Sequence, residues 1–279
     1  MRIGLVQLCS GDEVRANIEA ASAGIRQAAG EGARLIATPE MTSLMDMRPG
    51  ALMAKVKSEA EDEALAAFRA LATGLQRTLL IGSLPIRISP EKCANRSYLI
   101  GASGEIVARY DKIHMFDVEV GDGQSYRESA RFEPGGAAIL TRIEDLNIGL
   151  TVCYDLRFPH LYRSLAQAGA ELLCVPSAFT KVTGAAHWHV LLRARAIETG
   201  AYVMAPAQGG RHADGRETYG HSLVVGPWGE VLAEAEAAPM VITADIDPEA
   251  VRQARRRIPS LDHDRPIRAP VSVRDKKPL

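Results

Sequence analysis

The sequence predicts an α/β fold in which mostly parallel or mixed sheets are covered by helices. The expected elements follow the order β-α-β-α-β-β-β and then a second series of strands and helices, which is typical of α/β domains. The 279 residues suffice for one large domain or two small ones, and we favour one. Reactive side chains directly follow several strands, where open α/β sheets place their functional sites.

The composition favours a small-molecule protein of the cytoplasm. Lys and Arg number 33 against 34 Asp and Glu, a net charge of −1, so neither nucleic acid nor an anionic membrane is an expected partner. The chain starts with a short apolar strand rather than a signal peptide, and it contains no apolar run long enough to span a bilayer. The four cysteines are spaced neither as a zinc site nor as a redox pair, so no metal and no structural disulfide is expected.

The first half of the chain alternates between strand and helix patterns. Apolar residues recur every three or four positions in the helices and form short runs in the strands. We expect helices at 12–29 and 59–77 and strands at 2–8, 33–38, 79–84, 93–101 and 106–110. The strand at 33–38 ends in Thr-Pro-Glu-Met, so Glu40 lies at its carboxyl edge. A carboxylate there is either functional or a helix-cap or rim charge.

A long stretch without apolar periodicity, 116–136, follows the strand at 106–110. Loops of this length in compact domains are more often functional than not. Lys112 stands at its entrance and Glu128 in its middle. Taken singly, both would be ordinary surface charges.

The segment LNIGLTVCYDLRFP, residues 146–159, indicates a strand, a sharp turn and a helix. Cys153 falls at the end of that strand. The N-terminal amides of the next helix would create a positive field that lowers the pKa of Cys153, and the backbone N–H of Tyr154 could bind an oxyanion. The alternative is that Cys153 is a small buried apolar residue.

The second half repeats the alternation of elements. A polar loop at 177–184 and a charged, glycine-rich loop at 209–220 separate expected strands. We expect helices at 160–168, 186–199 and 248–257, strands at 171–176, 202–206 and 240–246, and a hairpin of 222–225 with 231–235. His187 and His189 are two residues apart, so on a helix they point in different directions and cannot chelate one metal.

Three strand-end residues make chemical sense together. Glu40 can take the proton of a thiol, Lys112 can stabilise a developing oxyanion, and Cys153 can attack an amide or nitrile carbon. A second carboxylate, Glu128, can hold the lysine and the leaving amine in register.

The motifs around these residues resemble the nitrilase superfamily of carbon–nitrogen hydrolases. They are TPEM at Glu40, YDKIHMFD at Lys112, YRES at Glu128 and GLTVCYDLRFP at Cys153. The resemblance covers Met1 to about Pro259. It implies a four-layer αββα sandwich, a Glu-Lys-Cys triad supported by a second glutamate, no cofactor, and homodimers or higher homo-oligomers.

The stretch from Pro176 to Val231 resembles the amidase branch that contains deaminated-glutathione amidase and ω-amidase. This likeness implies hydrolysis of a small carboxylate-bearing amide through a thioester, with Tyr154 at the oxyanion or substrate. It also implies substrate binding by Phe179, Thr180 and Trp188. His189 stands where the related pattern usually has Glu, and a changed charge near the pocket would alter the tolerated substrate.

Two alternatives remain open from the sequence. A nitrilase or an N-carbamoyl amidohydrolase would use the same triad. A non-catalytic or redox-sensing protein would use Cys153 only as a reactive thiol, although two carboxylates beside it argue against that role.

Assembly is expected through the two helices after the nucleophile. The expected apolar surface for a partner subunit consists of Leu161, Leu165, Ala168, Leu192 and Ile197. The residues divide into a carbon–nitrogen hydrolase domain, 1–259, and a polar tail, 260–279. The tail has little to bury and should pack on the partner or be mobile.

Overall fold

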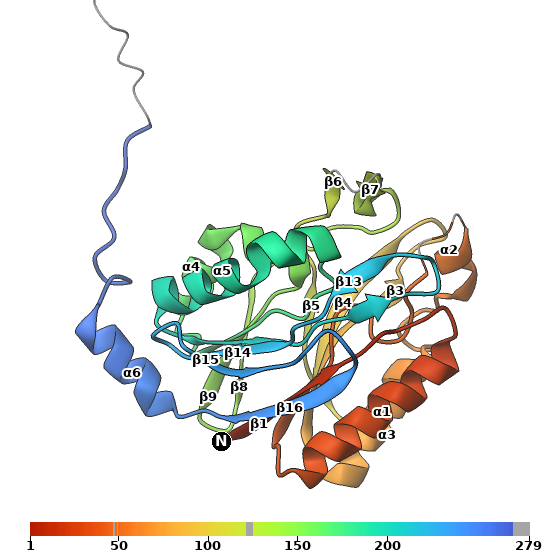
Figure 1. Cartoon of the computed structure of the whole chain (residues 1–279), viewed down its shortest axis with the longest axis horizontal. Coiled ribbons are helices and arrows are strands. Elements are labelled where there is room, and N and C mark those ends of the chain that lie inside the picture. Colours follow the sequence, from red (N-terminus) through yellow and green to blue (C-terminus); the bar gives the residue numbers. More distant parts are fainter. Residues whose placement is uncertain (47, 49, 121–124, 270–279) are drawn as a thin grey trace, which may run out of the picture.

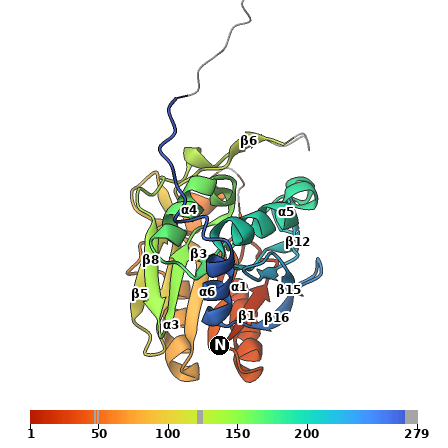
Figure 2. The same cartoon turned by 90° about the vertical axis from the view of Figure 1, so that its left-hand side faces the viewer.

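The computed structural model describes residues 1–46, 48, 50–120 and 125–269. Two six-stranded sheets lie face to face, with helices on their outer faces (Figures 1 and 2). The fold is therefore the expected four-layer αββα sandwich. Among the described residues, every helix is too short or too polar to cross a bilayer.

The first sheet has the strand order β16-β1-β2-β3-β4-β5. Its centre is parallel: β1 pairs with β2 and β2 with β3, while β16, β4 and β5 are antiparallel to their neighbours. The strands are β1 (Arg2–Gln7), β2 (Leu35–Ala37), β3 (Thr78–Arg87), β4 (Cys93–Ile100), β5 (Ile106–Asp111) and β16 (Met240–Asp245). The helices α1 (Val14–Gly30) and α3 (Glu63–Leu75) cover its outer face, and α2 (Ala51–Lys55) lies at its end (Figure 1).

The second sheet repeats this plan with the order β15-β14-β11-β10-β9-β8. Again three central strands are parallel and the flanking ones antiparallel. The strands are β8 (Ile139–Ile143), β9 (Leu146–Leu150), β10 (Leu172–Cys174), β11 (Tyr202–Ala205), β14 (Leu223–Val225) and β15 (Val231–Glu234). The helices α4 (Pro159–Gln167) and α5 (Lys181–Thr199) cover it, and α6 (Pro248–Arg257) lies at the edge of the sandwich (Figure 2).

Alternation along β1 divides the core. Ile3 and Leu5 point between the sheets, where they join residues such as Ile148 and Leu172 of the second sheet. Val6 points outward and packs with Ile25 of α1. Successive strand side chains face opposite sides, so one strand serves both apolar layers. Each fully buried aliphatic side chain stabilises the fold by about 1.5–3 kcal/mol.

Several expected elements have different bounds. The stretch 116–136 is partly regular, because β6 (Asp117–Glu119) pairs with β7 (Ser125–Arg127) before the short helix η1 (Glu128–Ala130). The glycine-rich loop 209–220 is also a hairpin, of β12 (Gly209–Arg211) and β13 (Glu217–Tyr219). Helix α5 starts five residues earlier than expected because the Thr180 side chain caps it by accepting from the Thr183 amide at 3.3 Å.

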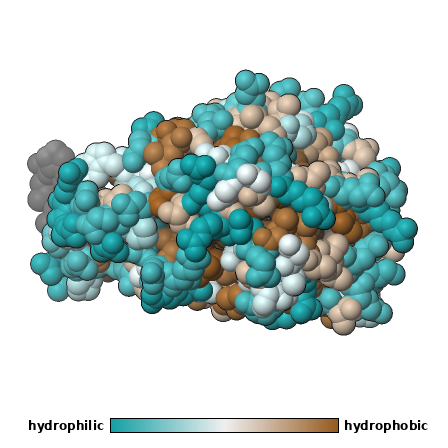
Figure 3. Space-filling view, turned by 90° about the horizontal axis from the view of Figure 1, so that it is seen from below, coloured by the Kyte–Doolittle hydropathy of each residue, from teal (hydrophilic) through white to brown (hydrophobic). Residues whose placement is uncertain are grey.

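The expected dimer surface is corrected in part. Leu161, Leu165 and Leu192 are buried within the chain's own core, so they are not free for a partner. Ile197 is exposed, as is Val190 on the same helix. On the face drawn in Figure 3, apolar side chains form several patches separated by hydrophilic ones.

The start of the C-terminal tail packs on its own chain. The Arg163 and Gln167 side chains of α4 both bond to Asp264, and Arg163 also donates to the Ser260 carbonyl at 2.8 Å. Residues 270–279 lie outside the described part of the tail. Its expected contact with a partner stays a prediction.

Candidate active site

Glu40 lies in a tight turn just beyond β2. The turn is fixed by a left-handed backbone at Met41, with φ of 56°, and by the Ser83 hydroxyl, which accepts the Met41 amide at 2.9 Å. Gln208, which follows β11 of the second sheet, donates to the Glu40 backbone carbonyl at 3.0 Å. Both sheets therefore hold this carboxylate, which is only 4% exposed.

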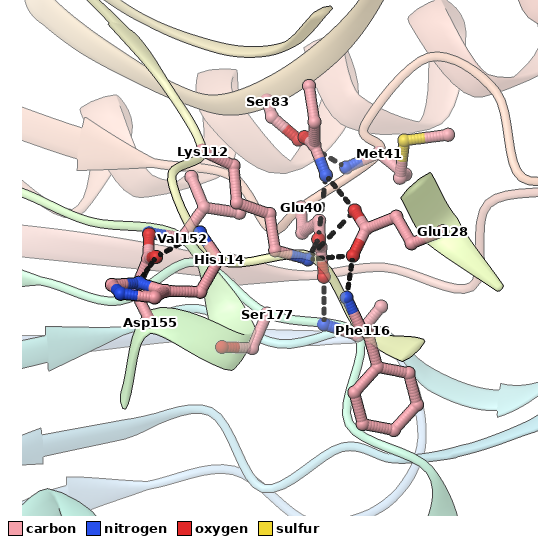
Figure 4. A network of polar contacts seen from close by, with 12 residues as sticks. Glu40, Met41, Ser83, Lys112, His114, Phe116, Glu128, Val152, Asp155 and Ser177 are labelled. Atoms are coloured by element: carbon pink, nitrogen blue, oxygen red, sulfur yellow. Dashed lines mark hydrogen bonds and ion pairs between the residues drawn. The ribbon is translucent and has the colours of Figure 1, made fainter. Parts of the chain in front are cut away.

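Lys112 leaves β5 and reaches into the space between the two sheets. Its ammonium donates to Glu40 Oε1 at 3.0 Å and to the two Glu128 oxygens at 2.9 and 2.7 Å (Figure 4). The lysine is 2% exposed, so water contributes little to its solvation and the two carboxylates replace it.

Glu128 opens the short helix η1 after the β6–β7 hairpin. Its Oε2 also accepts the Phe116 amide at 2.7 Å (Figure 4). This bond ties the two ends of the hairpin segment together. The sequence predicted a loop at Glu128, whereas the structure has a short helix there, held to the start of the hairpin through the Phe116 amide.

Asn95 is a member of the cluster that sequence reasoning missed. Its amide donates to Glu40 at 2.9 Å and to Glu128 at 3.1 Å, and its backbone carbonyl accepts the Lys112 amide at 3.0 Å. It is 2% exposed. The available signal was an asparagine, a residue type that strands disfavour, in the middle of the strand CANRSYLI, because a buried polar group requires hydrogen-bond partners.

Cys153 stands at the sharp turn between β9 and α4. Its φ is 51°, a left-handed conformation that is strained for a side-chain-bearing residue and common at active sites. Its amide donates to the Pro176 carbonyl at 2.9 Å, which links the turn to the end of the neighbouring strand. A short helix, η2 (Cys153–Arg157), starts at the cysteine and precedes α4.

Asp155 fixes this turn and was also missed from the sequence. Its carboxylate accepts the Val152 amide at 2.9 Å, the Tyr110 hydroxyl at 2.7 Å and the His114 amide at 3.0 Å. Figure 4 shows Asp155 beside Val152 and His114. Because Tyr110 and His114 flank Lys112, this aspartate sets the distance between lysine and cysteine.

The charges of the cluster depend on one another. Burial by itself lowers the pKa of Lys112, but the carboxylates of Glu128 and Glu40 outweigh it and hold that pKa well above its ordinary value. The lysine is therefore a permanent cation at neutral pH.

The expected thiolate at Cys153 is a wrong prediction. Burial and the adjacent Glu40 carboxylate, to which the thiol is hydrogen-bonded, raise the pKa of Cys153 well above that of a free cysteine, although Lys112 opposes them. The helix field was expected to lower it, but the positively charged end of α4 lies beyond η2. The resting side chain is a thiol beside a carboxylate that can accept its proton.

A cavity of about 380 Å³ opens onto Cys153, Glu40 and Lys112. Three of the four side chains expected at the substrate line it, namely Tyr154, Phe179 and Thr180. Trp188 does not: it is 1% exposed, packs against Phe179 with ring centroids 4.9 Å apart and donates to the His221 carbonyl at 2.8 Å. Its expected contact with substrate is corrected to support of the Phe179 wall.

His189 is also absent from the residues that line this cavity. Its Nε2 lies 2.8 Å from Glu234 Oε1 on β15. The expected change of charge near the pocket is therefore corrected, because His189 contacts Glu234 and does not line the cavity.

Four arginines line the cavity. Three of them face carboxylates: Arg48 pairs with Asp46, Arg127 with Glu119 and Arg216 with Asp214. Within the described residues, Arg131 has no ion-pair partner and is half-buried. The Cys153 thiol and the guanidinium of Arg131 therefore line the same cavity.

A four-layer sandwich with a buried carboxylate–lysine–cysteine cluster at the ends of its sheets defines the nitrilase superfamily as the class of this protein. The family model described as carbon-nitrogen hydrolase matches residues 2–256, and the chain belongs to this family. The protein is accordingly an amidase-type carbon–nitrogen hydrolase, as its motifs predicted.

Relatives and solved structures agree with this assignment. The deaminated glutathione amidase of Synechocystis is 40% identical over 263 residues, which cover 92% of this chain and 96% of that protein. The NitFhit protein of C. elegans superposes with a TM-score of 0.87 at 33% identity, covering 95% of this chain, while this chain spans 65% of that one. A mutant of the amidase from Nesterenkonia, with acrylamide added at its active-site cysteine, superposes with a TM-score of 0.79 at 28% identity. The match covers 92% of this chain and 98% of that one.

Proposed function

We propose that the protein hydrolyses a small carboxylate-bearing amide through a thioester on Cys153. The observation that carries the proposal is the buried Cys153 thiol against the Glu40 carboxylate, with Lys112 held between Glu40 and Glu128. A buried thiol with a base in contact and a fixed cation nearby is the arrangement that acyl transfer requires.

In the acylation step, the Cys153 sulfur attacks the amide carbon as Glu40 takes the thiol proton. Lys112 and the backbone N–H of Tyr154 stabilise the oxyanion of the tetrahedral intermediate. The C–N bond then breaks, and the proton on Glu40 passes to the leaving nitrogen, which departs as ammonia or an amine. Water then attacks the thioester carbon as Glu40 takes a proton from it. The C–S bond breaks, Glu40 returns that proton to the Cys153 sulfur, and the acid is released. Glu128 keeps Lys112 in place throughout.

The substrate class follows from the cavity wall. Its size suits a small ligand, and we infer that Arg131 receives the substrate's carboxylate, because the other lining arginines already face acidic groups. Deaminated glutathione, the substrate named for the Synechocystis relative, and the ω-amides of 2-oxo acids both carry such a carboxylate.

A panel assay tests this proposal. Ammonia or amine release is compared for deaminated glutathione, 2-oxoglutaramate and 2-oxosuccinamate, with simple nitriles and ureido acids as the alternatives. Mass spectrometry of quenched reactions should show an acyl adduct on Cys153. Full turnover by Cys153→Ala would refute the thioester, and turnover of nitriles or ureido acids alone would favour the alternative enzymes.

The role of Arg131 has a separate readout. Arg131→Gln should raise KM for the carboxylate substrate by about 10-fold or more, the loss of one charge-assisted contact, and change kcat little. Arg127→Gln, whose arginine faces Glu119, is the matched control and should leave KM nearly unchanged.

We further propose a homodimer in the cytoplasm. Val190 and Ile197 are 69% and 56% exposed on α5, and exposed apolar groups on one helix favour a subunit contact. A monomeric mass by light scattering at micromolar concentration would contradict the dimer.

A further inference from the structure

Three metal-ligating side chains from distant parts of the chain converge on the surface outside the active-site cavity. His189 projects from α5, His221 follows the β13 hairpin, and Glu234 ends β15. Glu234 Oε1 lies 2.8 Å from His189 Nε2 and 3.0 Å from His221 Nδ1, and all three ligand atoms lie within 4.8 Å of one another.

We propose that His189, His221 and Glu234 form a binding site for a zinc-class divalent cation. Two imidazoles and one carboxylate are a ligand set that Zn²⁺ accepts with water in its fourth position. Calcium and magnesium prefer all-oxygen sites, whereas imidazole suits zinc, nickel and copper.

The geometry needs little change to admit the ion. With metal–ligand distances of roughly 2.0–2.2 Å, ligand atoms around one ion lie somewhat farther apart than the present hydrogen bonds. Small side-chain movements therefore suffice. The side chains are 32%, 27% and 37% exposed, so the ion can reach them and keep a water.

Contacts outside the cluster hold part of this site in place. His221 has a left-handed backbone, with φ of 55°, and its ring stacks on Tyr219 at a centroid distance of 4.3 Å. Trp188, next to His189, donates to the His221 carbonyl at 2.8 Å. These contacts hold His221 in place before any ion binds, which lowers the entropic cost of binding.

Hydrogen bonds already hold the three side chains together. Each imidazole presents to Glu234 Oε1 the ring nitrogen that would bind the cation, and an imidazole can carry its proton on either ring nitrogen.

Binding would join side chains from three segments of the chain, namely α5, the 220–222 connection and β15. A cation held by α5, the 220–222 connection and β15 stabilises the folded state by mass action, because the unfolded chain has no such site. The bound cation would also be connected to the cavity wall, because Trp188, the neighbour of His189 on α5, packs against Phe179 of that wall. The expected readout is a thermal midpoint that rises with zinc concentration.

The experiment uses the full chain with Cys153→Ala, so that the nucleophile cannot bind zinc and the outcome is independent of the proposed amidase chemistry. After EDTA treatment and desalting, ZnCl₂ is titrated by calorimetry. We expect one equivalent to bind, and CoCl₂ to give the visible absorption of a four- or five-coordinate ion. MgCl₂ at the same concentration should not compete.

Variants locate the ion. His189→Gln, His221→Gln and Glu234→Gln should each weaken binding at least 10-fold, as expected for loss of a ligand. The matched control is His187→Gln, because His187 is exposed on the same helix but pairs with Arg157, and it should bind zinc as the parent does. Circular dichroism checks folding; if His221→Gln fails to fold, the other two variants decide.

Two results would overturn the site. The first is absence of stoichiometric zinc binding, which would leave the cluster as a hydrogen-bonded ion pair. The second is a zinc affinity that stays unchanged in His189→Gln and Glu234→Gln. A loss of affinity in the control His187→Gln as large as in those two variants would count equally against the site.

Discussion

Lys112→Met removes the positive charge that lies between two buried carboxylates. In the structure the ammonium makes three contacts of 2.7–3.0 Å with Glu40 and Glu128 and is 2% exposed. Breaking a buried ion pair by removing one partner costs about 3–5 kcal/mol, a large fraction of a typical stability of roughly 5–15 kcal/mol. The methionine fills the space of the lysine stem, so packing loss is small.

The stability effect is measured by urea denaturation at pH 7. Lys181→Met is the matched control, because Lys181 pairs with Glu217 at 3.2 Å but is 67% exposed; an exposed pair contributes about 0–1 kcal/mol. The raised pKa of Lys112 means that its contribution is complete below the ordinary lysine pKa of about 10.4 and is lost only as pH rises through the still higher folded value. The charge of Lys112 in the wild-type protein therefore stays constant between about pH 6 and 9, and the two variants are compared at one pH within that range.

The Lys112→Met variant should lose activity as well as stability. Loss of the cation should reduce kcat by on the order of 100-fold or more, as for loss of an oxyanion donor. Lys112→Arg should not rescue it, because a planar fork cannot replace a compact ammonium between two carboxylates. Equal unfolding free energies for Lys112→Met and Lys181→Met, or near-normal turnover by the arginine variant, would refute the reasoning.

The other predictions concern the groups around Lys112. Because the pKa of Cys153 is raised, the wild-type protein and Cys153→Ala should have the same thiolate absorbance in the far ultraviolet at neutral pH. A higher absorbance of the wild-type protein would show instead that Cys153 is a thiolate of low pKa. Glu40→Gln should abolish the acylation burst, whereas Glu128→Gln should still acylate slowly and be impaired at a later step; the opposite pattern in quenched-flow kinetics would reverse the two roles. Asn95→Ala, which loses bonds to both carboxylates, should lower kcat about 10-fold with KM little changed. A purely structural Asn95 would instead lower the urea midpoint and leave kcat intact.

The strand ends were the most predictable part of the molecule. Apolar runs and their breaks located β2, β5 and β9 from local composition, and a parallel sheet brings its carboxyl ends to one edge. Glu40 and Lys112, which follow β2 and β5 of the first sheet, were therefore foreseeable as neighbours, and the motifs around them and around Cys153 identified the family. Cys153 follows β9 of the second sheet, so the face-to-face packing of the two sheets brings it to the other two. Element bounds were less secure, as at α5, because the Thr180 cap is a side-chain contact that periodicity does not show.

Asn95, Asp155 and the protonation of Cys153 needed the tertiary structure. Asn95 acts across strands on carboxylates far away in sequence, and Asp155 joins the cysteine turn to β5 through Tyr110. The pKa of Cys153 depends on how deeply the turn is buried and which charge lies beside it. Sequence position reports neither quantity.

The sequence by itself determined the α/β class, the family, and the three strand-end residues Glu40, Lys112 and Cys153, because these depend on local patterns and short motifs. The tertiary structure decided which polar groups complete the cluster, why Trp188 lies behind the cavity wall, and how His189 meets His221 and Glu234. Hydrogen bonds and burial arise between segments that are distant along the chain, so only the packed fold reveals them.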